Sequence, residues 1–377
     1  MMIVFWISLF LVLFTYVGFF ALLYAVSLMK KKPLDKAEIE LSVSLIIAAY
    51  NEERVIREKL ENTLALDYPK GKLEIVVVTD GSIDRTVEIA REYAARGVTV
   101  LHEPERRGKT MALNRVVPLT RGEIIFFSDA NTHYAPETVR AMVRNFHDSS
   151  VGGVSGKKII RKDLNRKAMK GEEKFWNYEA MLKILETRVG SISTADGEIF
   201  ALRRSLFETI PRQIVHDDMY LTLRIVKKGF RVIYEPDATS EESASKSFKD
   251  EFFLKTRYAS AGYQILGEFS DMLIPPRSAF AWQFLCHKLL RWMAPFFLIV
   301  LYVASASAHT TIARIFFVLQ NLFYGSALLG YFLSRLNVSV GPLYYPLYFC
   351  MGNSAGLYGA FKFLRAGQTS LWRKAER

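Results

Sequence analysis

The stretch that decides the fold runs from Val43 to Glu53 and reads VSLIIAAYNEE. Its first part is almost entirely apolar, and the polar run Asn51-Glu52-Glu53 follows at once. A short apolar run bounded by polar residues is typical of a strand that is buried on both faces. Residues 52–64 have the pattern of a helix. The segment therefore predicts a buried strand, a polar loop at its carboxyl end, and a helix.

The same unit recurs along the chain. We expect further strands at LEIVVVTD (73–80), VTVLHE (98–103) and GEIIFFSDAN (122–131), with helices at 84–95 and from Pro136 onward. Strands that alternate with helices predict an α/β fold, with a mostly parallel, Rossmann-like sheet covered on both faces. Ligands bind at the carboxyl ends of such strands. Three polar loops fall there, at 51–53, 80–82 and 128–131, and we expect them to form one site.

The segment EPERRGKTMALN, residues 103–114, resembles a nucleotide-binding P-loop without meeting its requirements. A P-loop has glycine five residues before its Gly-Lys pair, where this chain has Glu103, and Pro104 removes a backbone donor. The chain also lacks the G-x-G-x-x-G pattern of dinucleotide-binding folds. Gly108 still allows close backbone approach, Lys109 supplies a positive charge, and the start of a helix favours an anion. We therefore expect a phosphate contact of a different kind.

Six segments carry a resemblance to a known family. They occur in one order between residues 42 and 262 and resemble the inverting family-2 glycosyltransferases with a GT-A fold. The membrane-embedded branch, which includes cellulose, hyaluronan, chitin and poly-N-acetylglucosamine synthases, is the most similar. The segments are AAYNEE, VVVTDGSIDRT, RRGKTMALN, FFSDAN, VHDDMYLTLRIVKKGFRVIY and LKTRYASAG.

This resemblance implies a membrane-bound enzyme that transfers a sugar from a UDP-sugar to a polysaccharide acceptor at the cytoplasmic face. Two alternatives stay open: transfer of a single sugar to a lipid acceptor, and an inactive scaffold or co-polymerase subunit. Extrusion of a polymer through few membrane helices would call for an oligomer or a secretion partner. The catalytic domain is expected at residues 41–270.

The resemblance also places the donor-binding residues. It puts Ala49, Tyr50 and Glu52 around the base and ribose and Asp80 at the uracil, although Asp80 alone is also typical of a turn before Gly81. Lys109 is expected to face the diphosphate.

The D-x-D metal motif of this family reads Asp129-Ala130-Asn131 here. Carboxylate and amide oxygens suit Mg²⁺ or Mn²⁺, so Asp129 and Asn131 are the expected metal ligands. Asp129 would alternatively contact the ribose, or both residues would simply cap the helix at Pro136.

The catalytic residues follow from two further segments. HDDMYLTLRIVKKGF resembles the T-E-D segment of the family, which makes Asp218 the general base, with Asp217 in place of glutamate and His216 in place of threonine. A helix start is the structural alternative. The Q-x-x-R-W motif reads LKTRY, which keeps Arg257 for the departing diphosphate and offers Tyr258 as a smaller stacking platform for the acceptor.

The segment STADGEIFALRR resembles the acceptor-lining segment of the family and places Asp196 and Gly197 there. Asp196 is either an acceptor contact or a turn residue. The sequence does not decide between these two roles.

Long uncharged segments predict a multi-pass protein of the cell membrane. Residues 1–29 contain no charged side chain and precede Lys30, Lys31 and Lys32, as in a transmembrane signal anchor whose amino terminus lies outside. A cleaved signal peptide is the alternative. Residues 293–364 predict about three further crossings, or two crossings and one re-entrant segment. An amphipathic helix at 279–292 is expected on the membrane surface, or else buried, and 365–377 form a basic tail.

Composition excludes several classes of protein. The chain has 377 residues, a net charge of +12 and two cysteines, Cys286 and Cys350, both in or beside the apolar segments. A disulfide framework is therefore not expected. No motif for binding nucleic acid is present, so the positive charge is better explained by attraction to anionic membrane lipids.

Overall fold

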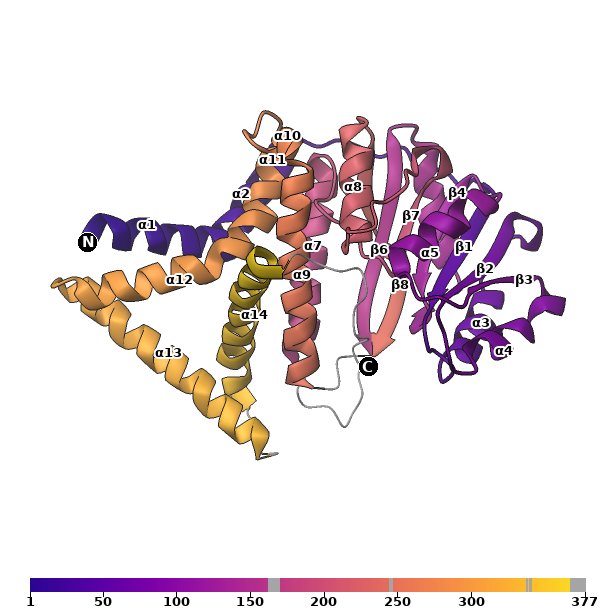
Figure 1. Cartoon of the computed structure of the whole chain (residues 1–377). Helices are drawn as coiled ribbons and strands as arrows, with labels where there is room; N and C mark the ends of the chain where they lie inside the picture. The colour runs from indigo at the N-terminus through magenta and orange to yellow at the C-terminus, as the bar shows by residue number, and fades with distance from the viewer. Residues whose placement is uncertain (162–169, 244–246, 337, 339–340, 367–377) are drawn as a thin grey trace.

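The computed structural model describes residues 1–161, 170–243, 247–336, 338 and 341–366. A mixed α/β domain occupies one side of the molecule, and a group of long helices occupies the other (Figure 1). Most of the basic tail expected at 365–377 lies outside the described residues.

Within the described residues, eight strands form one sheet in the order β3-β2-β1-β4-β7-β6-β8-β5. The strands β3, β2, β1 and β4 are mutually parallel, and β6 is parallel to β8. The strands β7 and β5 pair antiparallel with their neighbours. The expected mostly parallel sheet is confirmed, and the structure adds the strands β5, β6, β7 and β8 to it. The bounds are β1 Val43–Ala49, β2 Leu73–Asp80, β3 Val98–Glu103, β4 Ile124–Asp129, β5 Thr132–Tyr134, β6 Val151–Arg161, β7 Ile199–Arg203 and β8 Arg231–Ser243.

Helices cover both faces of the sheet because successive strand residues point to opposite faces. On β1, Leu45 and Ile47 pack into one core with Ile56 and Leu60, whereas Ile46 packs into the other core. The first core is covered by α3 Ile56–Leu64, α4 Thr86–Arg91 and α6 Thr138–Val143, and the second by α5 Lys109–Val116 and α8 Asp217–Lys227.

Three helices join the sheet domain to the long helices. They are α7 Lys170–Val189, α9 Phe248–Glu268 and the short α10 Ser270–Leu273. The helix α9 lies against α14, Tyr344–Ala366, at very short range: a Cβ added at Gly359 would lie 2.8 Å from the Thr256 carbonyl oxygen. Small residues allow such close approach of two helix backbones. The arrangement of α9 is therefore tied to the helical layer.

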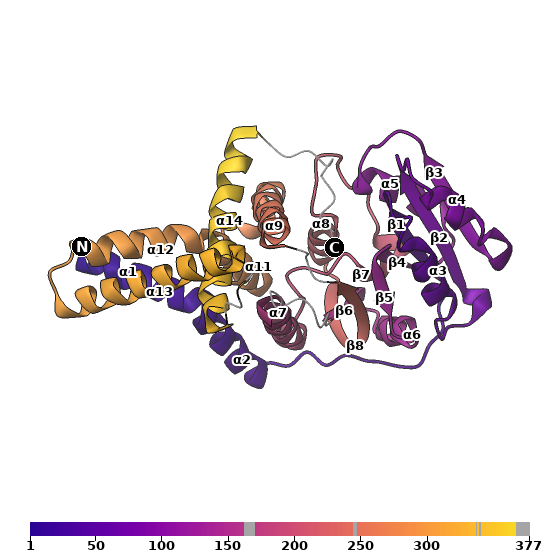
Figure 2. The ribbon, with the colours of Figure 1, turned by 90° about the horizontal axis from the view of Figure 1, so that it is seen from below.

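Three helices among the described residues are long and apolar enough to cross a membrane, by length and composition: Met2–Met29, Ala279–Ser307 and Thr311–Arg335. The first comprises α1 Met2–Leu13 and α2 Phe19–Met29, joined by a π-helical turn. The second comprises α11 Ala279–Phe284, a π-helical turn and α12 Leu290–Ser307, and the third is α13. The third of the expected carboxy-terminal crossings, α14, is not among them and runs across the direction of α12 (Figures 1 and 2).

The segment 279–292 differs from its expectation as a separate surface helix. It is the first half of the continuous helix that ends at Ser307. Its polar side chains do not face outward, because they contact two acids of α7. His287 Nδ1 lies 2.7 Å from Glu186 Oε1, and Lys288 Nζ lies 3.1 Å from Glu179 Oε2. The polar face thus packs this long helix against α7.

Candidate active site

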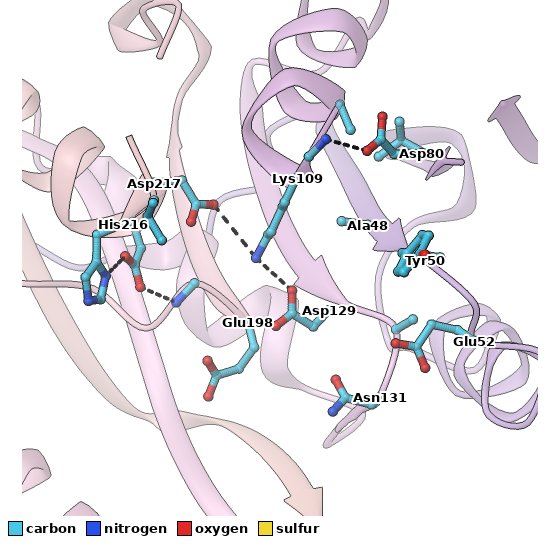
Figure 3. Close-up of a pocket in the computed structure, with 18 of the residues that line it drawn as sticks. Ala48, Tyr50, Glu52, Asp80, Lys109, Asp129, Asn131, Glu198, His216 and Asp217 are labelled. Carbon is cyan, nitrogen blue, oxygen red and sulfur yellow. Dashed lines mark hydrogen bonds and ion pairs between the residues drawn. The ribbon is translucent and has the colours of Figure 1, made fainter. Parts of the chain in front are cut away.

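The carboxyl ends of β2, β1 and β4 form the floor of one pocket of about 290 Å³ (Figure 3). Ala49 and Asp129 are the last residues of β1 and β4, and Asp80 is the last residue of β2. Since these three strands are neighbours in the sheet, the polar loops that follow them converge. Of the predicted site residues, the pocket is lined by Ala49, Tyr50, Glu52, Asp80, Lys109, Asp129, Asn131, Gly197, Asp217, Asp218, Arg257 and Tyr258.

Asp80 is held by the segment that resembled a P-loop. Its Oδ2 atom accepts hydrogen bonds from the backbone N–H groups of Arg107 and Gly108, at 3.0 and 2.6 Å. Gly108 has a φ of +97°, a conformation that glycine adopts at little cost. The Oδ1 atom of Asp80 is buried and has no hydrogen-bond partner among the described residues. A buried carboxylate oxygen of this kind is suited to accept a hydrogen bond from a ligand.

An aromatic ring and a guanidinium group lie beside Asp80. The Arg106 guanidinium lies 3.9 Å from the centroid of the Tyr50 ring, and both side chains line the pocket. Planar groups that stack in this way provide a surface for a planar base. This end of the pocket therefore has the chemistry to hold a nucleoside.

Lys109 stands at the centre of the site, between two acids (Figure 3). Its Nζ atom lies 2.7 Å from Asp129 Oδ1 and 3.8 Å from Asp217 Oδ2. Burial opposes its charge, but the carboxylates of Asp129 and Asp217 outweigh burial and raise the pKa of Lys109. The lysine is therefore a fixed positive charge in the middle of an acidic pocket.

Asp218 is the second residue of α8 and is held by three donors. Its Oδ2 atom accepts from the Gly197 N–H at 3.1 Å, and its Oδ1 atom accepts from the Met219 N–H at 2.7 Å. His216 Nδ1 lies 2.9 Å from Oδ1. Burial opposes ionisation, but the charge and hydrogen bond of His216 prevail and lower the pKa of Asp218 to about 2. Asp218 is thus a carboxylate at neutral pH, so Nδ1 of His216 carries the proton.

Asp217 is next to Asp218 but has the opposite shift. Burial raises the pKa of Asp217, against the attraction of Lys109, and the negative charge of Asp218 adds to the rise. Two adjacent acids whose pKa values separate are suited to different roles.

Asp129 and Asn131 present hard oxygen atoms to the same pocket. Asn131 donates from Nδ2 to Glu242 Oε1 at 2.8 Å, which leaves its amide oxygen on the side of Asp129 (Figure 3). Among the described residues, no group of three or more His, Cys, Asp and Glu is arranged to hold a metal alone. Mg²⁺ commonly takes one or two protein oxygens and completes its shell with water and substrate phosphates. The donor set fits a metal of this kind.

The wall opposite the nucleoside end comes from α9 and the loop before β7. Leu254, Arg257 and Tyr258 line the pocket from α9. The ring centroids of Tyr258 and His216 are 5.2 Å apart, and burial raises the pKa of the tyrosine. Gly197 lines the pocket, whereas Asp196 does not and instead pairs with Lys183 at 2.6 Å.

Several lining residues were not predicted as site residues from the sequence. Lys158 of β6 lies 3.2 Å from Glu198 and is also paired with Glu242 of β8, which holds Asn131. Lys158 and Glu242 come from strands without a recognisable motif, and the pairing of β6 with β8 brings these two residues together. Glu198 lies in the segment STADGEIFALRR, directly after Asp196 and Gly197, and that segment was the available signal. Arg106 lies in the segment 103–114, three residues before Lys109. This short separation could have indicated that Arg106 also belongs to the site.

The fold and the site together define a class of protein. The structure is similar to the mannosyltransferase PcManGT from Pyrobaculum calidifontis in complex with GDP-Man and Mn²⁺, with a TM-score of 0.73 and 25% identity over 96% of this chain and 99% of that one. The α/β domain is thus a GT-A fold of the glycosyltransferase class. Residues 44–210 match the model of Glycosyl transferase family 2.

Two curated relatives belong to different branches of glycan synthesis. A beta-monoglucosyldiacylglycerol synthase from Nostoc sp. strain PCC 7120 is 29% identical over 264 residues, which are 67% of this chain and 56% of the relative. A poly-beta-1,6-N-acetyl-D-glucosamine synthase from Staphylococcus aureus strain COL is 27% identical over 64% of this chain and 59% of the relative. The chain therefore spans less than two thirds of the length of these relatives.

Proposed function

We propose that the protein is an inverting glycosyltransferase that moves a sugar from a nucleotide-sugar donor to an acceptor at the cytoplasmic face of a membrane. The observation that carries this proposal is the ionised Asp218 in one pocket with Lys109 and the partly exposed Asp129. The carboxylate of Asp218 is able to take a proton from an acceptor hydroxyl group. The positive charge of Lys109 is able to stabilise a departing diphosphate.

In the proposed reaction, the acceptor oxygen bonds to the anomeric carbon while its proton passes to Asp218. The bond between this carbon and the diphosphate oxygen breaks on the opposite face, so the configuration inverts and the nucleoside diphosphate leaves. Lys109 and Arg257 stabilise its negative charge, and His216 positions Asp218. A divalent cation held by Asp129 and Asn131 would supply additional positive charge at the diphosphate.

The contacts of Asp80 support a uridine donor. Its Oδ2 atom is already used by two backbone N–H groups, which leaves Oδ1 as the acceptor for a base. Uracil presents one ring N–H to such an oxygen, whereas guanine presents a ring N–H and an amino group side by side. GDP-sugars remain the competing donors because the similar PcManGT was solved with GDP-Man and Mn²⁺.

A donor screen tests this assignment. The purified full-length protein is given UDP-, GDP- and TDP-sugars in turn, with and without a chelator, and release of the nucleoside diphosphate is measured. We expect release from a UDP-sugar and its loss with the chelator. Release from GDP-sugars alone would overturn the uridine assignment while leaving glycosyl transfer in place.

Two acceptors fit the site. Tyr258 would provide a stacking surface for the terminal sugar of a growing polysaccharide. A lipid acceptor is favoured by the contact of α9 with the candidate membrane span Ala279–Ser307, where the Tyr263 hydroxyl donates to the Trp292 carbonyl oxygen at 3.0 Å. Product size separates the two acceptors, because a polysaccharide gives a ladder of lengths and a lipid acceptor gives one product of lipid size.

A further inference from the structure

The side-chain amide of Asn131 is oriented by an acid from another strand. Its Nδ2 atom donates to Glu242 Oε1 at 2.8 Å. An ionised carboxylate has only acceptor oxygens, so the amide has to turn its nitrogen toward Glu242. The Oδ1 atom of Asn131 is thereby left on the side of Asp129 (Figure 3). Glu242 thus determines which end of this amide is available to a metal ion.

The sheet places Glu242 beside the amide and holds it there. In the antiparallel register, Glu242 of β8 is opposite Thr132 of β5, the residue that follows Asn131. The other edge of β8 pairs with β6, where Lys158 forms an ion pair with Glu242. Lys158 also lies 3.2 Å from Glu198, so these three side chains together carry more negative than positive charge. Glu242 is 2% exposed and lines the pocket.

The main chain around Asn131 is fixed by separate contacts. The buried Lys59 donates from Nζ to the Thr132 carbonyl oxygen at 2.8 Å. The Thr132 hydroxyl donates to the Asp129 carbonyl oxygen at 2.9 Å. These contacts set the path of the turn between β4 and β5. The direction of the Asn131 amide is a separate matter, which the hydrogen bond to Glu242 settles.

The charge of Glu242 also matters at this end of the pocket. A divalent cation held by Asp129 and Asn131 would meet one carboxylate and one neutral amide. The Lys109 ammonium group lies 2.7 Å from Asp129 and offsets the charge of that carboxylate. Glu242 adds negative potential directly beside the neutral ligand.

We propose that Glu242 is a positioning residue for the metal ion of this enzyme. It acts through Asn131, because it aims the amide oxygen at the cation and adds the negative charge that the amide lacks. The inference rests on the proposed function, in which a divalent cation assists the departing diphosphate. The competing role for Glu242 is purely structural, as an ion pair that joins β6 to β8.

Binding of Mn²⁺ to the full-length protein separates these two roles. The ion is titrated in detergent with UDP present, and in a second series with GDP. The paramagnetic resonance signal of free Mn²⁺ is measured against a blank of nucleotide without protein. Glu242→Gln keeps the size of the side chain but removes its charge and presents both a donor and an acceptor to the amide. We expect the affinity for Mn²⁺ to fall about 10–100-fold, and unchanged affinity would overturn the proposal.

Glu235→Gln is the matched control. Glu235 is also buried on β8 and ion-paired, in this case with Lys36 at 2.7 Å, but it does not line the pocket. This variant should bind Mn²⁺ as the unchanged protein does, whatever its effect on the melting temperature. A similar loss of affinity in both variants would assign Glu242 the structural role alone and overturn the proposal.

A second substitution should restore the metal site. In the double variant Asn131→Asp, Glu242→Gln, the carboxylate stands at position 131 and the glutamine amide is able to donate to it. The hydrogen bond is then kept with its direction reversed, and the negative charge is kept as well. The affinity for Mn²⁺ should return to within a few-fold of the unchanged protein. A double variant that folds but still binds Mn²⁺ weakly would contradict this account of Glu242.

Consumption of the donor distinguishes failure of this inference from failure of the proposed function. If the unchanged protein binds no Mn²⁺ and consumes a nucleotide sugar in the presence of a chelator, the role of Glu242 is refuted and glycosyl transfer stands. If Mn²⁺ binding follows the variants as expected but no nucleotide sugar is consumed, the proposed function fails and the role of Glu242 in the metal site stands.

Discussion

At the scale of single residues, Asp217 and Asp218 are neighbours in the chain whose pKa values are shifted in opposite directions. The hydrogen bond from His216 helps to keep Asp218 ionised, whereas burial and the neighbouring carboxylate raise the pKa of Asp217. The sequence placed both acids in the site through one motif. It could not give their different pKa values, because these depend on burial and on Lys109, which is more than a hundred residues away in the chain.

Asp196 shows another limit of sequence reasoning at this scale. An acidic residue before a glycine fits an acceptor contact and a turn equally well. In the structure Asp196 pairs with Lys183, and Glu198, two residues further along, lines the pocket instead. Which of two nearby acids faces a pocket depends on how the chain enters β7.

The two acids should affect stability in opposite directions. Because the pKa of Asp217 is raised on folding, its ionised form is disfavoured at pH 7, and Asp217→Asn should stabilise the fold. This gain should vanish below about pH 3.8, where the acid is protonated in both states. The lowered pKa of Asp218 gives stability that is present above pH 3.8 and lost as pH falls toward 2, so Asp218→Asn should cost on the order of 2 kcal/mol at pH 7.

Thermal unfolding of both variants in detergent, measured from pH 7 downward, checks these two predictions. Each variant serves as the control for the other because both replace an aspartate by its amide at the same helix start. A shift of the melting temperature in the same direction for both variants at pH 7 would contradict the opposed pKa values.

Lys109→Ala should weaken use of the donor without affecting membrane insertion. The side chain is the positive charge between Asp129 and Asp217, and its loss leaves the two carboxylates to repel a diphosphate. We expect a fall in kcat/KM of about 10²–10³-fold. Arg107→Ala is the matched control, because this side chain is exposed, pairs with Glu105 and does not line the pocket. A similar loss in both variants would argue against a specific role for Lys109.

At the scale of helices and strands, the sequence predicted the first half of the sheet well and the second half poorly. The strands β1, β2 and β4 are buried over most of their length and read as apolar runs, and β3, at the edge of the sheet, is partly exposed. The strand β5 has three residues and β6 begins with two glycines after Val151, so neither gives a clear pattern. Likewise, the polar stripe on residues 279–292 predicted an exposed face, because the acids that bury it belong to the distant helix α7.

Close packing of α9 on α14 gives a prediction for these helices. A Cβ at Gly359 would lie 2.8 Å from the Cβ of Ala259 and from a backbone oxygen, so Gly359→Ala must push the helices apart. We expect a loss of about 1–3 kcal/mol and reduced transfer, since α9 carries Arg257 and Tyr258. Gly352→Ala, whose nearest contact is 3.7 Å, should be neutral or stabilising by up to about 1 kcal/mol. Melting temperatures and activities of the two variants check this; equal effects would contradict it.

At the scale of the whole molecule, the candidate membrane spans lie on one side of the α/β domain that holds the candidate site (Figure 1). The proposed topology has the amino terminus outside, Lys30 to Lys32 in the cytoplasm, and residues 308–310 outside between two candidate spans. Composition was sufficient to predict the apolar segments. It was insufficient to show that α14, with its tyrosines and glycines, packs across the others.

Cysteine labelling tests this topology. In a chain with Cys286→Ser and Cys350→Ser, His309→Cys should react with an impermeant maleimide on intact cells, because the loop after α12 is expected outside. Lys31→Cys should react only after the membrane is opened, because the lysine cluster is expected inside. Labelling of both positions from the same side would be incompatible with a crossing between them.

The central claim is that Asp218 is the base of a glycosyl transfer, and nucleotide release by the purified protein tests it most directly. The unchanged protein and Asp218→Asn are compared with the same donor and acceptor, together with donor binding measured separately. The account predicts that the variant binds the donor but releases nucleoside diphosphate about 10²–10⁴-fold more slowly. Equal rates in the two proteins would contradict the account.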